Sequence, residues 1–435
     1  MDIVSLSACY CPRVNQLLRP LRLGPFRTIF LSRVVSELGT WLAYIGLTVA
    51  VFDRTHSASW VGALLLLDML PAVLLGFALA PLLDRLNRKQ ILVAAEATSG
   101  VLFAVLVFLH GLAPLLVVAG LSGVASSLFL PSLSAALPQV VSDQDLPQAN
   151  ALVRGVSSLA ILVGPPIAGV LVGFAGVATV FAVNSISYLI SALLLSRISR
   201  ASLQSQSTEH SQTESEDSGS LFTGHWQRAR QGFALFRPPR LKAVLVGWSL
   251  VCFALSAINI CEVLIAKRVF AVGDSGFGLL AAGSGAGLLV GSLLLSWLAT
   301  RRSSFFLYSV GLLWAGVFVM AAAVSPWFPM AWVFFAIGAA GNALALTSMQ
   351  VVLQRGLPEE SSGQGFGVFS SCATAFSVLG FVAAGPIADH YGARAVWFTA
   401  GGFLVVGSLA SLAIARGADS SDSGAVKSLD SEPSF

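Results

Sequence analysis

The chain has 435 residues, of which 56% are hydrophobic and only 11% charged, and its mean hydropathy is +0.82. So apolar a composition excludes a soluble globular protein, and the length allows many membrane crossings. The formal net charge is only +4, and we expect the partner of such a chain to be a lipid bilayer and not a nucleic acid.

Twelve apolar segments have about the 20 residues that a helix needs to cross a hydrocarbon core. A membrane β-barrel would instead show alternating segments about half as long. We therefore predict an all-α membrane protein with twelve transmembrane helices. They lie near residues 27–51, 59–81, 90–109, 112–135, 149–173, 176–196, 242–266, 276–299, 304–324, 327–350, 363–386 and 394–415.

The polar stretches outside these segments divide the chain. Residues 1–25 carry arginines and no apolar run, which predicts a cytoplasmic tail and not a cleaved signal peptide. Residues 202–220 are rich in Ser, Gln, Thr and acidic residues, which predicts a disordered linker, whereas 226–237 mixes aromatics with arginine and predicts either a membrane-surface helix or a partner-binding segment. The predicted parts are a tail (1–25), a six-helix bundle (26–197), a cytoplasmic linker (198–240), a second six-helix bundle (241–415) and a cytoplasmic tail (416–435).

The positions of Lys and Arg predict the orientation. With both termini in the cytoplasm, 19 of the 25 cations lie on the cytoplasmic side and 4 outside. Cytoplasmic loops carry such an excess of cations because Lys and Arg cross a membrane poorly. We expect a multi-pass protein of the cell (plasma or inner) membrane. The four outer cations are Arg54, Lys267, Arg268 and Arg394.

The turn between the second and third predicted helices is densely charged. It contains Asp84, Arg85, Arg88 and Lys89. The cations alone could serve only to hold the turn in the cytoplasm. The added acid favours a cytoplasmic gate, because it can form charge-assisted hydrogen bonds in one conformation and lose them in another. This Asp-Arg-x-x-Arg-Lys pattern resembles the signature loop of the major facilitator superfamily of secondary transporters, with Ala80 where that family has glycine.

The fifth predicted helix contains a second recognisable motif, formed by Gly164, Pro165, Pro166 and Gly169. The prolines remove backbone donors and favour a bend, and the glycines allow a neighbouring helix to approach. The motif resembles the Gly-Pro motif of the superfamily's exporters, although an ordinary kinked and tightly packed helix would have the same composition. Residues 136–151 and 350–358 are similar to cytoplasmic loops of the branch that contains enterobactin exporters and macrolide efflux pumps.

The two halves resemble each other weakly. Arg302 follows the eighth predicted helix as Lys89 follows the second, and Pro386 lies in the eleventh helix where Pro166 lies in the fifth. Like-oriented repeats indicate two six-helix bundles related by an axis along the membrane normal, a parallel pseudo-repeat.

Charged residues inside the predicted spans are candidates for coupling. Arg33 and Glu37 are four residues apart and so share one helix face. Glu37, Asp68 and Glu262 are candidate proton-coupling residues, because burial disfavours the charged form of a carboxyl group and lets it exchange protons with either side. Two alternatives stay open: Glu37 and Arg33 form a structural charge pair, and Glu262 forms an outer salt bridge with Lys267 or Arg268.

Other polar residues in the spans have simpler explanations. We expect Glu96 to bond to the cationic loop nearby. Asn184, Asn342 and Gln350 either line a cavity or form hydrogen bonds between helices.

Nothing in the sequence indicates an enzyme. All five histidines fall in predicted loops or the linker, and no zinc-protease, phosphate-loop or nucleophile motif is present. The five cysteines suggest neither a disulfide framework nor a convincing metal site. We therefore expect no catalytic residue, metal or cofactor, and transport that draws on an ion gradient.

Together these patterns predict a secondary transporter that functions as a monomer. It would export a small amphipathic organic molecule, such as a drug, macrolide or siderophore, by proton antiport and alternating access. One alternative is a proton-coupled importer with the same fold, and the other is a transport-inactive membrane receptor or assembly factor.

Overall fold

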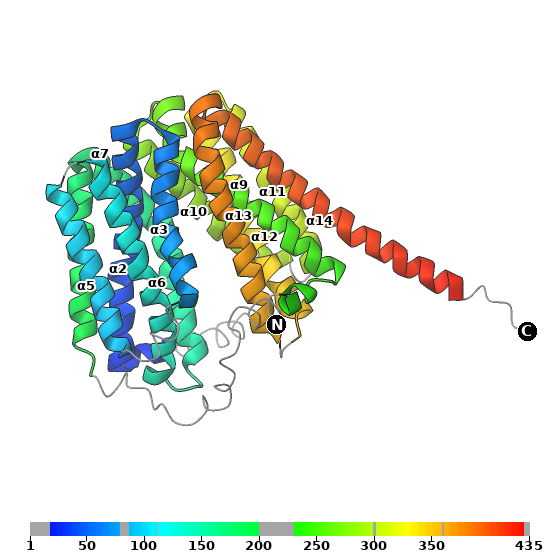
Figure 1. Ribbon diagram of the computed structural model, residues 1–435, viewed down its shortest axis with the longest axis horizontal. Helices are drawn as coiled ribbons and strands as arrows, with labels where there is room; N and C mark the ends of the chain where they lie inside the picture. The colour runs from blue at the N-terminus through cyan, green and yellow to red at the C-terminus, as the bar shows by residue number, and fades with distance from the viewer. Residues whose placement is uncertain are drawn as a thin grey trace, which may run out of the picture. The chain divides into compact units, whose positions relative to one another are not determined.

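The computed structural model of the protein describes residues 18–78, 87–109, 111–199, 230–298, 302–358 and 361–429. All regular elements in these ranges are helices, as predicted (Figure 1). Asp84 and Arg85 of the signature loop, the linker stretch 202–220 and the cysteines at 9 and 11 lie outside the described residues.

The helices are numbered along the chain. The first half contains η2 (Arg19–Arg22), α2 (Gly24–Thr55), α3 (Ala58–Ala78), α5 (Arg88–Phe108), α6 (Leu112–Val140) and α7 (Leu146–Ser196). The second half contains α9 (Pro239–Leu264), the π-helical turn η4 (Ile265–Val269), α10 (Gly273–Leu298), α11 (Ser304–Val324), α12 (Phe328–Gly356), α13 (Ser362–Tyr391) and α14 (Ala393–Leu429).

Twelve crossings can be assigned to these helices. Ten helices in the described residues are long and apolar enough to span a membrane. One of them, α7, has 51 residues and is interrupted at Gly176, whose φ of 77° and ψ of 167° are not helical, so it provides two crossings. The apolar helix α3 provides the remaining one.

Contacts divide the chain into two compact units. One comprises Met1–Thr208 and Val272–Ala282, and the other comprises Glu209–Ala271 and Gly283–Phe435. The beginning of α10 therefore groups with the first unit.

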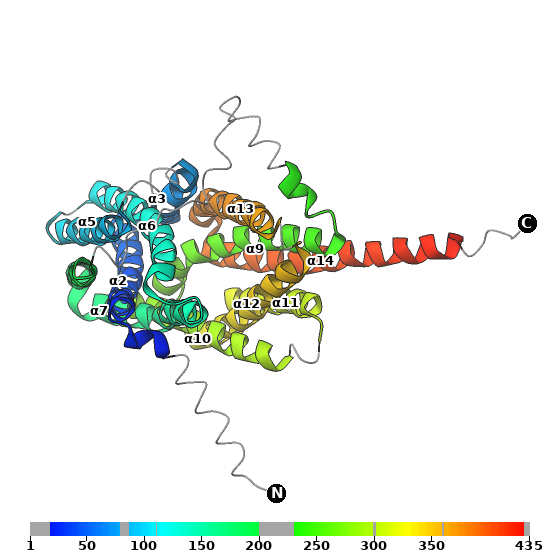
Figure 2. The same cartoon turned by 90° about the horizontal axis from the view of Figure 1, so that it is seen from below.

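In the first unit, α2 packs mainly against α7, α3 against α6, and α5 against both α6 and α7. Figure 2 shows these helices nearly end-on. An apolar cluster joins one end of α2, α5, α6 and α7, where Phe26, Leu92, Leu133 and Leu195 are at most 4% exposed. Because lipid is as apolar as these side chains, close van der Waals packing holds such helices together.

In the second unit, α9 packs against α13 and α14, and α11 packs against α12 and α14. Trp397 of α14 is fully buried, stacks on Phe335 with ring centroids 4.8 Å apart, and donates its indole N–H to the Ile258 carbonyl at 3.2 Å. The short helical segment that includes Gly232 contacts Val368 of α13. This part of the predicted linker (198–240) therefore packs on α13.

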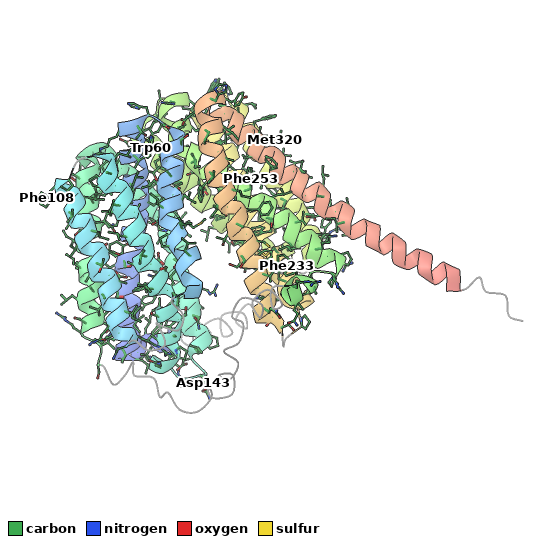
Figure 3. All side chains as sticks on the ribbon, viewed as in Figure 1. Trp60, Phe108, Asp143, Phe233, Phe253 and Met320 are labelled. Atoms are coloured by element: carbon green, nitrogen blue, oxygen red, sulfur yellow. The ribbon has the colours of Figure 1, made fainter. Side chains whose placement is uncertain are left out.

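Large apolar side chains also cover the outside of the helices. Phe108 is 77% exposed and projects outward from α5 (Figure 3), and Phe174 is 89% exposed. A soluble monomer rarely exposes so much apolar surface, whereas helices in a bilayer present such side chains to lipid.

Candidate functional site

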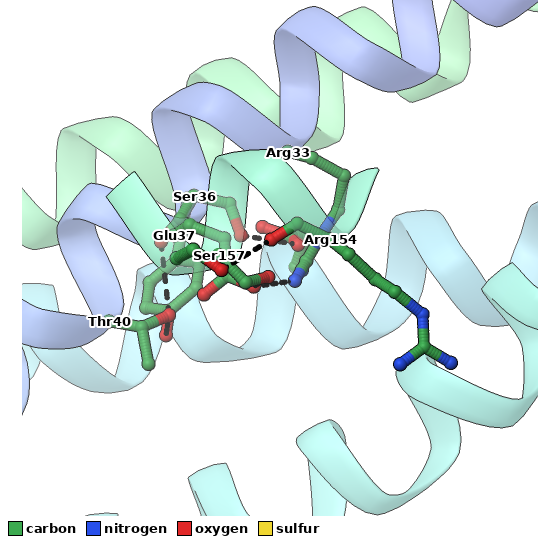
Figure 4. A network of polar contacts seen from close by, with 9 residues as sticks. Arg33, Ser36, Glu37, Thr40, Arg154 and Ser157 are labelled. Carbon is green, nitrogen blue, oxygen red and sulfur yellow. Dashed lines mark hydrogen bonds and ion pairs between the residues drawn. The ribbon is translucent and has the colours of Figure 1, made fainter. Parts of the chain in front are cut away.

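The predicted pairing of Arg33 with Glu37 is present in the first unit (Figure 4). The Arg33 guanidinium donates a hydrogen bond to Glu37 Oε1, and the two side chains are only 8% and 13% exposed. Ser157 of α7 donates a second hydrogen bond to Glu37 Oε1 at 2.6 Å. The Arg33 guanidinium carbon lies 5.2 Å from the centre of the Phe129 ring, a cation–π contact. The pair is therefore held by three helices.

Glu96 belongs to the same cluster, which corrects our expectation that it bonds to the cationic loop. It is 3% exposed, and its Oε1 accepts a hydrogen bond of 2.9 Å from Ser36, the residue beside Glu37. The packing of both α2 and α5 on α7 brings it there, and the sequence contains no signal for that contact. Arg154, by contrast, lies on α7 with its guanidinium directed away from the pair (Figure 4).

A cavity of about 120 Å³ opens onto this cluster. That volume is room for several water molecules. Its polar lining residues are Arg33, Ser36, Glu37, Thr40, Glu96, Ser99, Ser126 and Tyr188.

Asp68 of α3 lines a neighbouring cavity of about 150 Å³. Thr40, Ser126 and Tyr188 line both cavities. Thr40 Oγ1 and Tyr188 Oη share a hydrogen bond of 3.1 Å. Glu37 and Asp68 therefore line two cavities that share a wall of three hydroxyl side chains, which the sequence did not predict. Thr40 lies four residues after Ser36 on the same helix. This spacing places both hydroxyl groups on the face of Glu37 and could have predicted a polar wall there.

Arg88 and Lys89 begin α5 and bond to the ends of two other helices. Arg88 Nη1 donates to the Ala135 carbonyl of α6 at 2.8 Å, and Lys89 Nζ donates to the Ile198 carbonyl just after α7. A cation is favourable at Ile198 because a helix carries a partial negative charge at its C-terminus. The Asn87 side chain caps α5 by accepting from the Lys89 backbone N–H at 3.0 Å.

The Gly-Pro motif lies in the first part of α7 at two close helix contacts. A Cβ at Gly164 would lie 2.5 Å from Trp41 Cβ, and one at Gly169 would lie 2.6 Å from Gly278 Cα, both within the first unit. Close packing by the glycines is thus present, but the dihedral break in α7 falls at Gly176 and not at Pro165 or Pro166.

Glu262 lies apart from these residues, in the second unit. It is 6% exposed and lines a cavity of about 50 Å³ together with Asn259 and Asn342. Among the described residues no ion pair joins Glu262 to Lys267 or Arg268, so the predicted outer salt bridge is not formed. The Gln350 side chain is exposed, and Asn184 is fully buried next to Ser187.

Comparison with known proteins adds the family. The model of a family described as transmembrane secretion effector, within the major facilitator superfamily, matches residues 16–433. The uncharacterized MFS-type transporter YfiS of Bacillus subtilis (strain 168) is 26% identical over 397 residues, which is 88% of this chain and 92% of that protein.

Two further relatives carry names that describe export. Macrolide efflux protein A of Streptococcus pyogenes is 21% identical over 393 residues, covering 88% of this chain and 93% of its own. The enterobactin exporter EntS of Shigella boydii serotype 18 is 33% identical over 162 residues, which is 35% of this chain and 38% of its own.

Among solved structures, a bacterial homolog of the human lysosomal transporter Spinster, in an inward-facing and unoccupied conformation, is similar over 90% of this chain and 97% of its own. The TM-score is 0.71 at 16% sequence identity. At so low an identity the likeness concerns the fold alone, and it confirms the predicted fold class.

Proposed function

Because the chain belongs to the transmembrane secretion effector family of the major facilitator superfamily, we propose that it exports a small amphipathic organic molecule in exchange for protons. Members of this family are transporters, so the chain is a multi-pass membrane transporter and not an enzyme. The observation that carries the proposal is the buried Arg33–Glu37 pair, whose cavity shares a polar wall with that of Asp68.

In the proposed cycle, Glu37 and Asp68 take up and release the proton, and Arg33 holds Glu37 while it is charged. Protonation of Glu37 would remove the negative charge that pairs with Arg33. The guanidinium would keep its contact with Phe129 and the nearby charge of Glu96, while helix α2 would lose its ion pair and could change its packing against α7. A breakable ion pair of this kind connects protonation to a conformational change.

The gate is proposed to lie at the cytoplasmic ends of the first-unit helices. Asp84 and Arg85 would act with Arg88 and Lys89, whose bonds to Ala135 and Ile198 join the start of α5 to α6 and α7. The close contacts of Gly164 and Gly169 would keep α7 tightly packed while the cavity is closed.

Export of an amphipathic substrate is supported by two relatives named for macrolide efflux and for enterobactin export. We further propose that the chain acts as a monomer in the plasma or inner membrane. Both termini would lie in the cytoplasm, in keeping with the distribution of its cations.

The test uses purified protein in proteoliposomes that hold a pH-sensitive dye. An imposed pH gradient is followed while macrolides, siderophores and other amphipathic compounds are added one at a time. We expect one of them to collapse the gradient, and the loss to disappear in Glu37→Gln and in Asp68→Asn.

The matched control is Asp143→Asn, in the exposed turn before α7, which should exchange as the unaltered protein does. Unchanged exchange in Glu37→Gln or Asp68→Asn would remove that residue from coupling. Substrate flux without proton movement would reject antiport, and flux in the opposite direction would favour the importer.

A further inference from the structure

The small cavity of the second unit has a lining that the proton cycle does not use. Four polar side chains from three helices meet there: Asn259 and Glu262 of α9, Ser284 of α10 and Asn342 of α12. Asn259 and Glu262 are three residues apart and so share a face of α9. All of these residues belong to the second unit.

Two groups in this cavity lack partners within the described part of the chain. The Glu262 side chain, 6% exposed, has neither an ion pair nor a hydrogen bond. The side-chain oxygen of Asn342 is buried and accepts no hydrogen bond. An unpaired buried carboxylate costs several kcal/mol, and buried polar atoms nearly always have a partner. Both groups therefore point to a ligand.

The charge of the lining residues indicates the charge of the ligand. One carboxylate balances a single positive charge, and no group of three or more His, Cys, Asp or Glu exists among the described residues to hold a divalent or transition metal. The remaining groups supply two amide oxygens and one hydroxyl oxygen, which are hard ligands suited to hard cations.

The volume of the cavity also limits the size of the ligand. A cavity of about 50 Å³ is far smaller than the roughly 300–1,000 Å³ of sites for drug-sized molecules. Phe335 and Leu404 are among the apolar residues that complete its wall, and they lower the local dielectric and strengthen the attraction between an ion and the carboxylate.

The backbone next to the site is also unusual. Immediately after α9 the chain forms the π-helical turn η4, closed by the Phe270 N–H bonding to the Ile265 carbonyl at 3.0 Å. This turn begins three residues after Glu262 and ends the helix that carries Asn259 and Glu262.

We propose that Glu262, Asn259, Asn342 and Ser284 form a binding site for a sodium ion. The inference concerns the second unit alone and does not rest on the proposed proton exchange through Glu37 and Asp68.

The experiment measures thermal unfolding of the purified full-length protein in detergent. Sodium chloride is titrated while choline chloride keeps the ionic strength constant, and potassium chloride is titrated in parallel. A ligand that binds only the folded state raises its stability with concentration. We expect a rise in Tm that grows with sodium and is much smaller with potassium.

Variants of the lining residues test whether the sodium-dependent rise in Tm comes from this cavity. Glu262→Gln should abolish the sodium-dependent rise, and Asn342→Leu should weaken the apparent sodium affinity by at least about tenfold, the loss seen when even an outer partner of a metal ligand is removed. Glu96→Gln is the matched control, because Glu96 is a buried acid of the first unit and its variant should keep the rise.

An equal rise with potassium, or a sodium-dependent rise that survives in Glu262→Gln, would overturn the proposal. If Glu262→Gln does not fold, equilibrium dialysis with radioactive sodium decides the matter: we expect one ion per chain in the unaltered protein and weakened binding in Asn342→Leu. Binding that is equal in these two proteins would equally reject the site. Failure of the dye assay would leave all of these readouts unaffected.

Discussion

At the scale of single residues, the most informative feature is that the charges in the first unit are buried together. Arg33, Glu37 and Glu96 come from α2 and α5 and face one cavity. A buried ion pair adds little net stability compared with apolar residues of the same size, because both charges lose their hydration. Removing one partner is nevertheless costly, since the other stays buried and unpaired.

This asymmetry predicts the stability of Arg33 variants. Arg33→Met should destabilise the protein by about 3 kcal/mol, because Glu37 loses its cation. Adding Glu37→Gln in the same chain should recover most of that loss. The measurement is Tm of the purified protein in detergent for the two single variants and the double variant.

The control for the Arg33 series is Arg154→Met, since Arg154 is exposed and directed away from the pair, and its Tm should be unchanged. A double variant that is as unstable as Arg33→Met would mean that the arginine acts through Phe129 or other contacts and not through Glu37.

At the scale of helices, glycines set how closely neighbouring elements approach. Gly123 of α6 lies against the backbone of Asp68 in α3, so that a Cβ there would collide with the Asp68 carbonyl. A Cβ added at Gly120, one turn earlier on α6, would have no other atom within 4 Å. The close contact between α3 and α6 therefore requires a glycine at position 123 but not at position 120.

We expect Gly123→Val to lower the yield of folded protein sharply, because the backbone of α3 cannot move aside as a flexible side chain would, and overpacking costs roughly 1–3 kcal/mol or more. Gly120→Val adds the same atoms to open space and should fold normally. Size-exclusion chromatography of fluorescent fusions measures both yields, and equal yields would show that α3 and α6 can separate without cost.

The break in α7 lies at a glycine. Pro165 and Pro166 predict a bend within the helix, and the residue with non-helical dihedral angles is Gly176, further along it. Its positive φ is a conformation that glycine adopts without steric cost and other residues rarely adopt. The predicted gap between 149–173 and 176–196 nevertheless fell within two residues of this position.

At the scale of the whole molecule, the distribution of cations predicts the orientation in the membrane. Asp143 lies in the turn between α6 and α7, and Tyr391, 71% exposed, is the last residue of α13, just before the turn to α14. In a cysteine-free background, Tyr391→Cys should react with a membrane-impermeant maleimide in intact cells. Asp143→Cys should react only after permeabilisation.

Labelling of both variants after permeabilisation provides the control for folding and access. The reverse pattern in intact cells would place the termini outside and would reject the orientation derived from the 19 cytoplasmic cations.

The sequence by itself determined the class, the number of crossings and the family. Hydropathy specifies the crossings because every backbone polar group in a bilayer must be satisfied within a helix. The spacing of Arg33 and Glu37 likewise predicted their pairing, because residues four apart on a helix lie on one face.

Only the tertiary structure decided which polar residues share a site. Glu96 is 59 residues from Glu37 in the sequence and Ser157 is 120 residues away, and both reach the pair because α2 and α5 each pack on α7. The same holds for Glu262, whose cavity needs α9, α10 and α12 together. Helical periodicity relates residues within one segment, whereas contacts between segments depend on the rotation and depth of each helix, and these are set by side chains that are distant in the sequence.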